Sequence, residues 1–462
     1  MNSQDVFEAR LEAALRAYGD QAALPFDASA IAGRAMDAAH PRSWVRTVLV
    51  PAAILTLLLA LAAGIATLTS PPPEPEPLPS AEAVVTGGEL TVGAGEGHAA
   101  VRLDDGRLLI ISGSWEGFGG APTSAGELWD PDTGATSGDV AELIIDRSSA
   151  TATLLEDGRV LVVGGYGGDA YPSTAVGGAE VWDPASGSFA ATGTLAQARV
   201  NHSAILLADG RVLIVGGAGP DGHLTSAEMY DPDGGTFSPA GEMTAARAGH
   251  TATLLPDGRV VVLGGQTPAS GSGLPRPALT VEMWDPATGA FTTAGQLAEP
   301  RRGHTATLLS DGRVLVVGGY FGPGYSLNGT PGAVRMEVLD PDPAIVDGYP
   351  SPAEVWDPST SSVSPGGSLR EARTGHTATL LGDGRVAVIG GSVVRQEGSR
   401  YFLVQLDTVE IWNPDTGTFA VGPALDHPRS AHSAIQMDAD TVLVLGGGFG
   451  PDALTSVEVW EP

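Results

Sequence analysis

Residues 304–319 read HTATLLSDGRVLVVGG, which places His304, Asp311 and Arg313, three side chains able to do acid–base or anion-binding chemistry, within one short stretch. Nearly the same string stands at 250–265 and at 376–391. The histidine occupies one repeat position, at His98, His202, His250, His304, His376 and His432. Ala150 stands there in the remaining copy, and groups spread evenly through a repeat cannot gather at one site. We therefore interpret these histidines as structural, half-buried and hydrogen-bonded to a neighbouring unit.

Two further charged positions recur. Six arginines stand three residues before the histidine position, at Arg147, Arg199, Arg247, Arg301, Arg373 and Arg429. Each copy also has a glutamate inside an apolar stretch, at Glu127, Glu180, Glu228, Glu282, Glu354, Glu410 and Glu458. A carboxylate in such a place needs a partner, so we predict Arg–Glu pairs within or between units.

The elements that carry these residues form seven copies of one unit. "HTATLL" predicts a short strand, Asp-Gly a tight hairpin turn, and "RVLVVGG" a strand covered on both faces. The glycine pair marks a close backbone approach, although the first copy has Ser112-Gly113. An acidic–apolar–aromatic triplet such as "EVW" forms a third strand, and stretches such as "AFTTAGQL" form a fourth.

Four antiparallel strands repeating about every 54 residues predict an all-β fold, a seven-bladed β-propeller over residues 86–462. The last unit ends at "VEVWEP" without a fourth strand, whereas a spare strand precedes the first unit. We predict that residues 86–94 pair with the strand of Trp460 and close the ring, which removes exposed edges.

The glycine doublet, the aromatic residue and the spacing resemble the kelch repeat, and the fold is similar to the central domain of galactose oxidase. The latter resemblance implies a copper site with tyrosines, histidines and a Tyr–Cys cross-link. This chain has no cysteine, and only His40, His223 and His427 lie outside the repeat position. We therefore expect no copper site, no cofactor and no enzymatic activity.

Three segments precede the repeats. Residues 1–46 are polar and predict a short amphipathic helix in "DVFEARLEAALRAY". Residues 47–69 carry no charge over 23 residues, enough to span a membrane, and Arg42 and Arg46 before them place the N-terminus in the cytoplasm. Residues 70–85 contain a proline-rich stalk. A cleaved signal peptide is the alternative to a single-pass anchor, but its apolar region would be shorter.

Composition limits the partners. The chain has 54 acidic and 24 basic residues, for a net charge of −30, which argues against nucleic acid. All the basic residues are arginines, and together with abundant Ala and Gly they indicate a bacterial source. The absence of cysteine excludes disulfides and thiolate sites. The oligomeric state is left open.

The loops between second and third strands vary in length, and with the links between units they emerge on one face, whereas the Asp-Gly turns emerge on the other. We call the first of these the elaborated face. Because binding residues concentrate in variable loops on a rigid scaffold, we expect ligand contacts from Trp115, Tyr166, Tyr171, Tyr320, Phe321, Tyr325, Arg335, Tyr349, Arg395, Arg400 and Tyr401. Phe118, His223, Arg276, Asp340, Asp347 and Phe449 are further candidates on this face.

These observations favour a non-catalytic module outside the cell that binds a protein or a glycan through the elaborated face. A transmembrane sensor whose N-terminal helix engages a cytoplasmic regulator, and a carbohydrate-active enzyme, are the alternatives.

Overall fold

The computed structural model describes residues 85–91, 94–95, 97–111, 113, 124–140, 142–167, 174–268, 276–319, 327–328, 335–338, 351–397, 400–448 and 454–462. The chain divides into two compact units, Met1–Glu76 and Pro77–Pro462, and all described residues belong to the second. The predicted N-terminal helix, the span 47–69 and the stalk therefore lie outside the described residues. Within those residues, no helix is long and apolar enough to cross a membrane.

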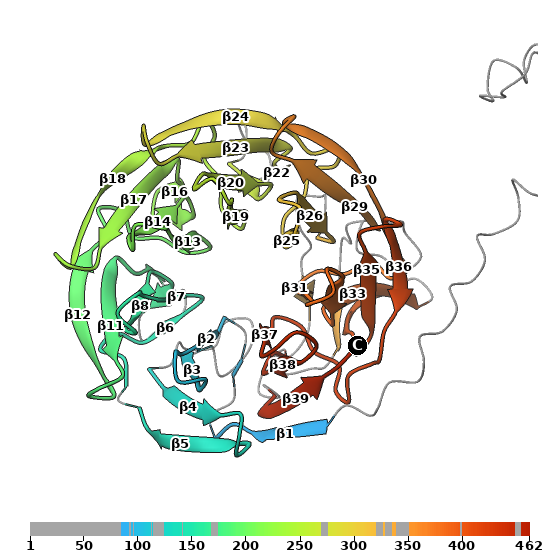
Figure 1. Ribbon diagram of the computed structural model, residues 1–462, viewed down its shortest axis with the longest axis horizontal. Coiled ribbons are helices and arrows are strands. Elements are labelled where there is room, and N and C mark those ends of the chain that lie inside the picture. The colour runs from blue at the N-terminus through green and yellow to red at the C-terminus, as the bar shows by residue number, and fades with distance from the viewer. Residues whose placement is uncertain are drawn as a thin grey trace, which may run out of the picture. The chain divides into compact units, whose positions relative to one another are not determined.

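The second unit is all-β, and its four-stranded antiparallel sheets are arranged around a central channel, as in a β-propeller (Figure 1). Each copy of the repeat contributes to one such sheet. From the channel outward, the strands are β2 (Ala99–Arg102), β3 (Leu108–Ile111), β4 (Gly126–Asp130) and β5 (Ala135–Asp139); β7 (Thr151–Leu154), β8 (Val160–Val163), β11 (Gly178–Asp183) and β12 (Ser188–Thr194); β13 (Ser203–Leu206), β14 (Val212–Val215), β17 (Ser226–Asp231) and β18 (Thr236–Glu242); β19 (Thr251–Leu254), β20 (Val260–Leu263), β23 (Thr280–Asp285) and β24 (Ala290–Gln296); β25 (Thr305–Leu308), β26 (Val314–Val317), β29 (Ser351–Asp357) and β30 (Ser362–Leu369); β31 (Thr377–Leu380), β32 (Val386–Ile389), β35 (Val409–Asn413) and β36 (Thr418–Val421); and β37 (Ser433–Gln436), β38 (Val442–Leu445), β39 (Ser456–Trp460) and β1 (Val85–Glu89).

The ring closes as predicted. Strand β1 pairs antiparallel with β39, with Val85 opposite Val459 and Glu89 opposite Ser456. Leu90, directly after β1, is buried in the cluster that also contains Trp129 of the first copy and Leu445 of the last. The segment before the first copy therefore completes the sheet of the last copy, which leaves β39 without an exposed edge.

Apolar packing joins successive sheets. The four residues of β20 are fully buried, as expected for a strand with a sheet on each side. Trp284 of the fourth copy packs with Leu213 and Met229 of the third copy, and its indole N–H donates to the carbonyl of Ala240 at 2.9 Å. The aromatic residue of each triplet thus belongs to the interface with the preceding sheet, and the indole N–H groups of Trp284, Trp356, Trp412 and Trp460 donate to carbonyl oxygens there.

Short strands add to the elaborated face. They are β6 (Arg147–Ser148), β9 (Tyr166–Gly167) and β10 (Thr174–Ala175); β15 (Ala218–Gly219) and β16 (Gly222–His223); and β21 (Gln266–Thr267) and β22 (Arg276–Pro277). An additional four-stranded sheet consists of β27 (Leu327–Asn328), β28 (Arg335–Val338), β34 (Arg400–Gln405) and β33 (Ser392–Glu397). It joins the long insertion of the fifth copy to the hairpin of the sixth copy.

Candidate functional site

The repeated histidines lie at the junctions between copies. His304 of the fifth copy is buried, and its Nε2 lies 3.0 Å from the Thr251 hydroxyl of the fourth copy. Burial, and then the charge of Arg301, lowers the pKa of His304 to about 3, so the ring is neutral. The same bond recurs between Thr305 and His376, and between Ser433 and His98 across the ring closure. The predicted bond to a neighbouring unit is confirmed for five of the six histidines, and most of the rings are buried rather than half-buried.

The first glycine of each doublet makes room for that ring. A Cβ placed on Gly264 would lie 2.6 Å from Cε1 of His304, and Gly264 has a φ of 60°. Both a clash and left-handed backbone strain therefore oppose any larger residue there. The close approach predicted from the sequence is confirmed, and its cause is the histidine of the following copy.

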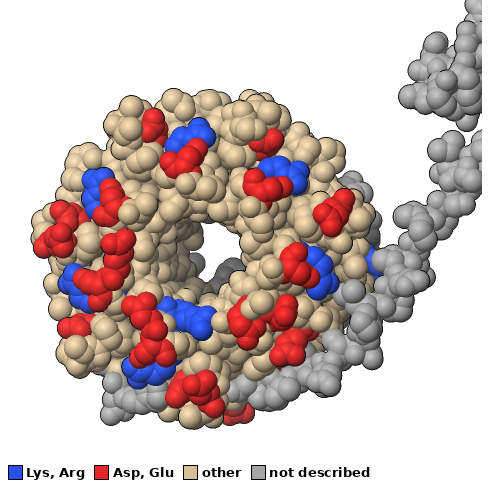
Figure 2. All heavy atoms as spheres, viewed as in Figure 1, with Lys and Arg blue, Asp and Glu red and all other residues tan. Residues whose placement is uncertain are grey.

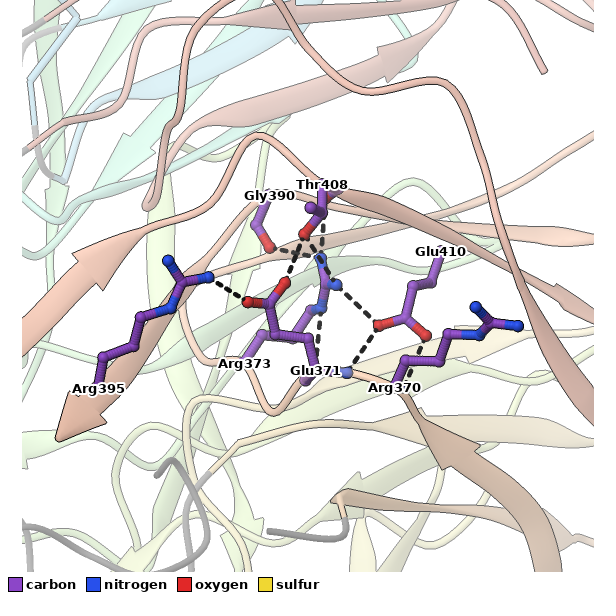
Figure 3. Close-up of polar contacts among 7 residues, drawn as sticks. All are labelled: Arg370, Glu371, Arg373, Gly390, Arg395, Thr408 and Glu410. Atoms are coloured by element: carbon purple, nitrogen blue, oxygen red, sulfur yellow. Dashed lines mark hydrogen bonds and ion pairs between the residues drawn. The ribbon is translucent and has the colours of Figure 1, made fainter. Parts of the chain in front are cut away.

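The predicted Arg–Glu pairs are also present. Arg247 and Glu282 are fully buried and 2.5 Å apart, and Arg247 also donates to the carbonyl oxygens of Gly264 and Thr280 at 3.1 and 2.9 Å. Burial lowers the pKa of Arg247, an effect that the charge of Glu282 opposes. In the sixth copy, Glu410 accepts from Arg373 at 2.8 Å and from two backbone N–H groups of the link before β31 (Figure 3). Each pair holds the segment that precedes an innermost strand against a sheet, so we assign these pairs a structural role.

The arginines of the Asp-Gly-Arg turns pair locally. Arg313 lies 2.7 Å from the carboxylate of Asp311, and its hydrogen bond lowers the pKa of that carboxyl. Equivalent exposed pairs occur in five other copies. Figure 2 shows one face of the ring, where basic side chains lie next to acidic ones around the central opening. The repeated charges therefore satisfy one another.

A functional site must use residues that the repeat does not explain, and some of these make contacts between copies on the elaborated face. The residue just before the histidine position has a left-handed φ, and Asn201 is a non-glycine example at 51°. Because it lies two residues before the innermost strand β13, Asn201 lies at the inner rim. Its side chain is exposed and donates weakly to the hydroxyl of Tyr166, in the preceding copy, at 3.5 Å.

The next two copies make a similar contact. Arg302 is partly buried in the link before β25, and its guanidinium donates to the side-chain carbonyl of Gln266 in the fourth copy. Gln266 stands directly after a glycine doublet, as Tyr166 does. His223 of the third copy is partly exposed, and burial and the charge of Arg302 lower its pKa. We call Tyr166, Asn201, His223, Gln266 and Arg302 the channel-mouth cluster.

The additional sheet brings four predicted residues together. Arg335 of β28 stands opposite Val404 of β34, while Arg395 pairs with Phe402 and Tyr401 with Gln396. Arg395 lies 2.6 Å from Glu371, which also accepts from the Thr408 hydroxyl at 2.9 Å (Figure 3). Arg400, opposite Glu397, is exposed. This sheet is a second concentration of polar groups, but Arg395 is engaged with an acidic side chain.

Other predicted residues lie outside the described residues, namely Trp115, Tyr171, Tyr320, Phe321, Tyr325 and Tyr349. Sequence reasoning selected Tyr166 and His223 but missed Asn201, Gln266 and Arg302. A signal was available for Arg302, because the equivalent places hold Ser148, Val200, Ala248, Thr374 and Ser430, all smaller and uncharged. Among the residues that the structure describes, no group of three His, Cys, Asp or Glu side chains could hold a metal ion.

Neither a protein-family model nor a curated protein matches the chain. Among solved structures, the chain is similar to a fungal alcohol oxidase of the AA5 family determined in complex with copper, at 19% identity and a TM-score of 0.59. The alignment covers 82% of this chain and 76% of the oxidase. It supports the galactose oxidase-like, all-β propeller fold.

The same comparison corrects two expectations from the sequence. The comparison contradicts the expected non-catalytic binding module and the expected lack of enzymatic activity, because a protein that shares this fold is a copper alcohol oxidase. The prediction rested on the missing copper residues, and these bear on one type of active site rather than on catalysis in general.

Proposed function

We propose that this protein is a carbohydrate-active enzyme that acts on a hydroxyl group of an uncharged sugar or related alcohol at the channel mouth. The observation that carries the proposal is the channel-mouth cluster, in which Tyr166 bonds to Asn201 and Gln266 bonds to Arg302, each across a junction between copies on the elaborated face. The alcohol oxidase neighbour supports it at the level of fold and reaction class.

The chemistry of the cluster suits such a substrate. Tyr166, Asn201 and Gln266 carry uncharged donors and acceptors, which match sugar hydroxyl groups. Arg302 and His223 add a cation and a group able to exchange a proton. The net charge of −30 disfavours a polyanionic substrate.

Copper of the AA5 type does not fit the residues present. The chain has no cysteine for a Tyr–Cys cross-link. The junction histidines are committed to packing, and five of them bond to a Thr or Ser of the neighbouring copy. The proposed chemistry therefore does not involve copper and relies on the channel-mouth cluster.

The test is a substrate screen with the full-length protein. Neutral monosaccharides, oligosaccharides and primary alcohols are incubated with it, and products are identified by mass spectrometry and NMR. We expect turnover of at least one neutral sugar or alcohol, and strong loss of turnover in the combined variant Tyr166→Phe, Asn201→Gly and Gln266→Ala. Arg259→Gln, on an Asp-Gly-Arg turn, is the control. No turnover of any substrate, or full turnover by the combined variant, would overturn the proposal.

The location and the blade number complete the proposal. We infer seven blades, one for each copy, and a bacterial membrane anchor at 47–69 that holds the propeller outside the cytoplasm. The uncharged 23-residue stretch and the preceding Arg42 and Arg46 support the anchor. Protease added to intact cells should cleave the propeller, and carbonate extraction should leave the protein in the membrane fraction. Recovery in the cytosol would contradict the anchor.

A further inference from the structure

The link into the first copy lacks the arginine that fastens the other six links. Gly95 stands three residues before His98, at the place where the arginines of the structural pairs recur. Each of those arginines donates to a glutamate and to the carbonyl of the first glycine of a doublet, as Arg247 does to Glu282 and Gly264. A buried guanidinium therefore ties six links to their sheets, and glycine replaces it in the seventh.

Glu127 occupies the glutamate position of the first copy. It accepts from the backbone N–H of Thr91 at 2.8 Å and from the hydroxyl of Thr136 in its own sheet. The other links make a similar backbone bond, such as the one from Thr244 to Glu282 at 2.6 Å, and their arginines add charge-assisted bonds to it. Because glycine cannot supply these additional bonds, we expect the first link to detach at a lower free energy than the others.

The innermost strands of the last and first copies are also the least closely joined. β2 and β37 lie against each other over a shorter stretch than any other two successive innermost strands. Arg102 of β2 crosses this junction, and its guanidinium donates to the carbonyl oxygens of Gln436 and Met437 at 3.2 and 2.7 Å. Leucine, which cannot form this bridge, stands at the same place in five other copies.

The residues that close the ring also reach the inner rim. We call residues 85–91 and 94–98 the closing strap. Its first part contains β1, which pairs with β39 at the outer edge. In its second part, the carbonyl of Gly97 accepts from the N–H of Ser149 in the second copy at 2.7 Å. Ser149 has a left-handed φ of 55° and is the second-copy counterpart of Asn201, so a displacement of the strap acts on the inner rim.

We propose that the closing strap is releasable, and that the ring opens between the last and first copies before any other junction separates. Arg102 holds this junction shut at the end of β2, and β1 holds it shut at the outer edge. Release frees the edge of β39 and withdraws Gly97 from Ser149. Because the chain enters the propeller at β1, movement of the segment before residue 85 acts on the strap first. The opening is a conformational device that connects the N-terminal side of the chain to the inner rim.

Native-state hydrogen exchange of the full-length protein, measured by mass spectrometry at urea concentrations below the unfolding transition, tests the proposal. We expect the amides of β1 and β39 to exchange at least about ten-fold faster than those of the matched pair β24 and β23, because a strap that opens locally exposes them first. The N–H of Ser149 should exchange with them. Equal exchange in the two pairs of strands would overturn the early opening. Early exchange at β39 with slow exchange at Ser149 would overturn the connection to the inner rim.

Two substitutions should move this exchange in opposite directions. Arg102→Leu introduces the leucine that other copies carry, and exchange at β39 should become about ten-fold faster, as for the loss of a hydrogen bond from a charged group. Gly95→Arg should supply a guanidinium to Glu127 and slow the exchange. Arg107→Gln, on the exposed turn of the same copy, is the control and should change nothing. Unchanged exchange in Arg102→Leu would overturn the role of the bridge, and unchanged exchange in Gly95→Arg would overturn the role of the replaced arginine.

A disulfide between β1 and β39 gives a reversible test. Glu89 and Ser456 stand opposite each other, and the chain has no cysteine, so the variant Glu89→Cys and Ser456→Cys can form one intramolecular disulfide only. In the oxidised protein, β39 should exchange as slowly as β23, and reduction should restore the fast exchange. Fast exchange that persists in the oxidised protein would overturn the release of β1 as the step that opens the ring.

Discussion

The junctions between copies and the mouth of the channel contain the same residue types in different surroundings. At the junctions, His304 is buried and bonded to Thr251, and Arg301 is buried with Glu354. At the mouth, His223 is partly exposed, and Arg302, next in sequence to Arg301, donates to the side-chain carbonyl of Gln266. The difference shows that repetition and charge neutralisation identify structural residues, whereas a contact that occurs once, at an accessible place, identifies a candidate site.

Acid should affect the junctions more strongly than any single substitution. The pKa of His202, His250, His304 and His376 is lowered from 6.5 to about 3, so the unfolded chain binds more protons than the folded protein between these values. Stability from the neutral rings is therefore complete above pH 6.5 and is lost as the pH falls toward 3. Urea denaturation should show a midpoint that falls steadily from pH 7 to pH 4. A flat profile would contradict the burial of these rings.

Opening the ring should have the next largest effect. Deletion of residues 81–95 removes β1, Leu90 and Ala94, and exposes the edge of β39. We expect the melting temperature to fall by at least about 5 °C, as for the loss of one or more buried apolar side chains. A deletion that stops at residue 80 is the control. Equal melting temperatures for the two deletions would show that β1 does not close the ring.

Breaking one buried pair comes next. Arg247→Met leaves the carboxylate of Glu282 buried without its cation, which typically costs about 3–5 kcal/mol. Chemical denaturation measures this cost. The double variant Arg247→Met and Glu282→Leu should recover part of it, because both charges are then absent. A single variant as stable as the wild type would refute the structural role of the pair.

Filling the space beside a junction histidine should cost less. Gly264→Ala introduces both a left-handed alanine and a contact with His304, for about 2 kcal/mol. Adding His304→Ala removes the contact but not the strain. If the double variant recovers no stability beyond that expected for separate sites, the histidine is not what limits this position.

The smallest effect is expected on the Asp-Gly-Arg turns. Arg313 and Asp311 are partly exposed, and such pairs contribute about 0–1 kcal/mol. Arg313→Gln should leave the urea midpoint almost unchanged and should not alter turnover. A loss of turnover in this variant would show that the face of the Asp-Gly turns contributes to function. It would contradict the assignment of the site to the elaborated face.

Much of the scaffold follows from local rules that repeat. The hairpins and the Arg–Glu pairs depend on residues whose pattern recurs in six or seven copies, so that several examples support one inference, and the closing strand follows from a comparison of the first and last copies. The contact between Arg302 and Gln266 depends on the curvature of the ring, which brings links and loops of different copies together. No local pattern encodes that distance. The pairing of β28 with β34 was hidden for the same reason, since it joins two loops that are each unique.

The contact between a histidine and the first glycine of the preceding copy also explains two irregularities in the chain. Ala150 lacks the ring in the second copy, and the sequence of the first copy has Ser112 where the other copies have the first glycine. Elsewhere, Gly164 faces His202 and Gly446 faces His98. Duplicated copies in a closed ring therefore do not diverge independently, because each change constrains the neighbour on one side. Exchange of single copies between such proteins should succeed only when the histidine and the glycine that contact each other across a junction are exchanged together.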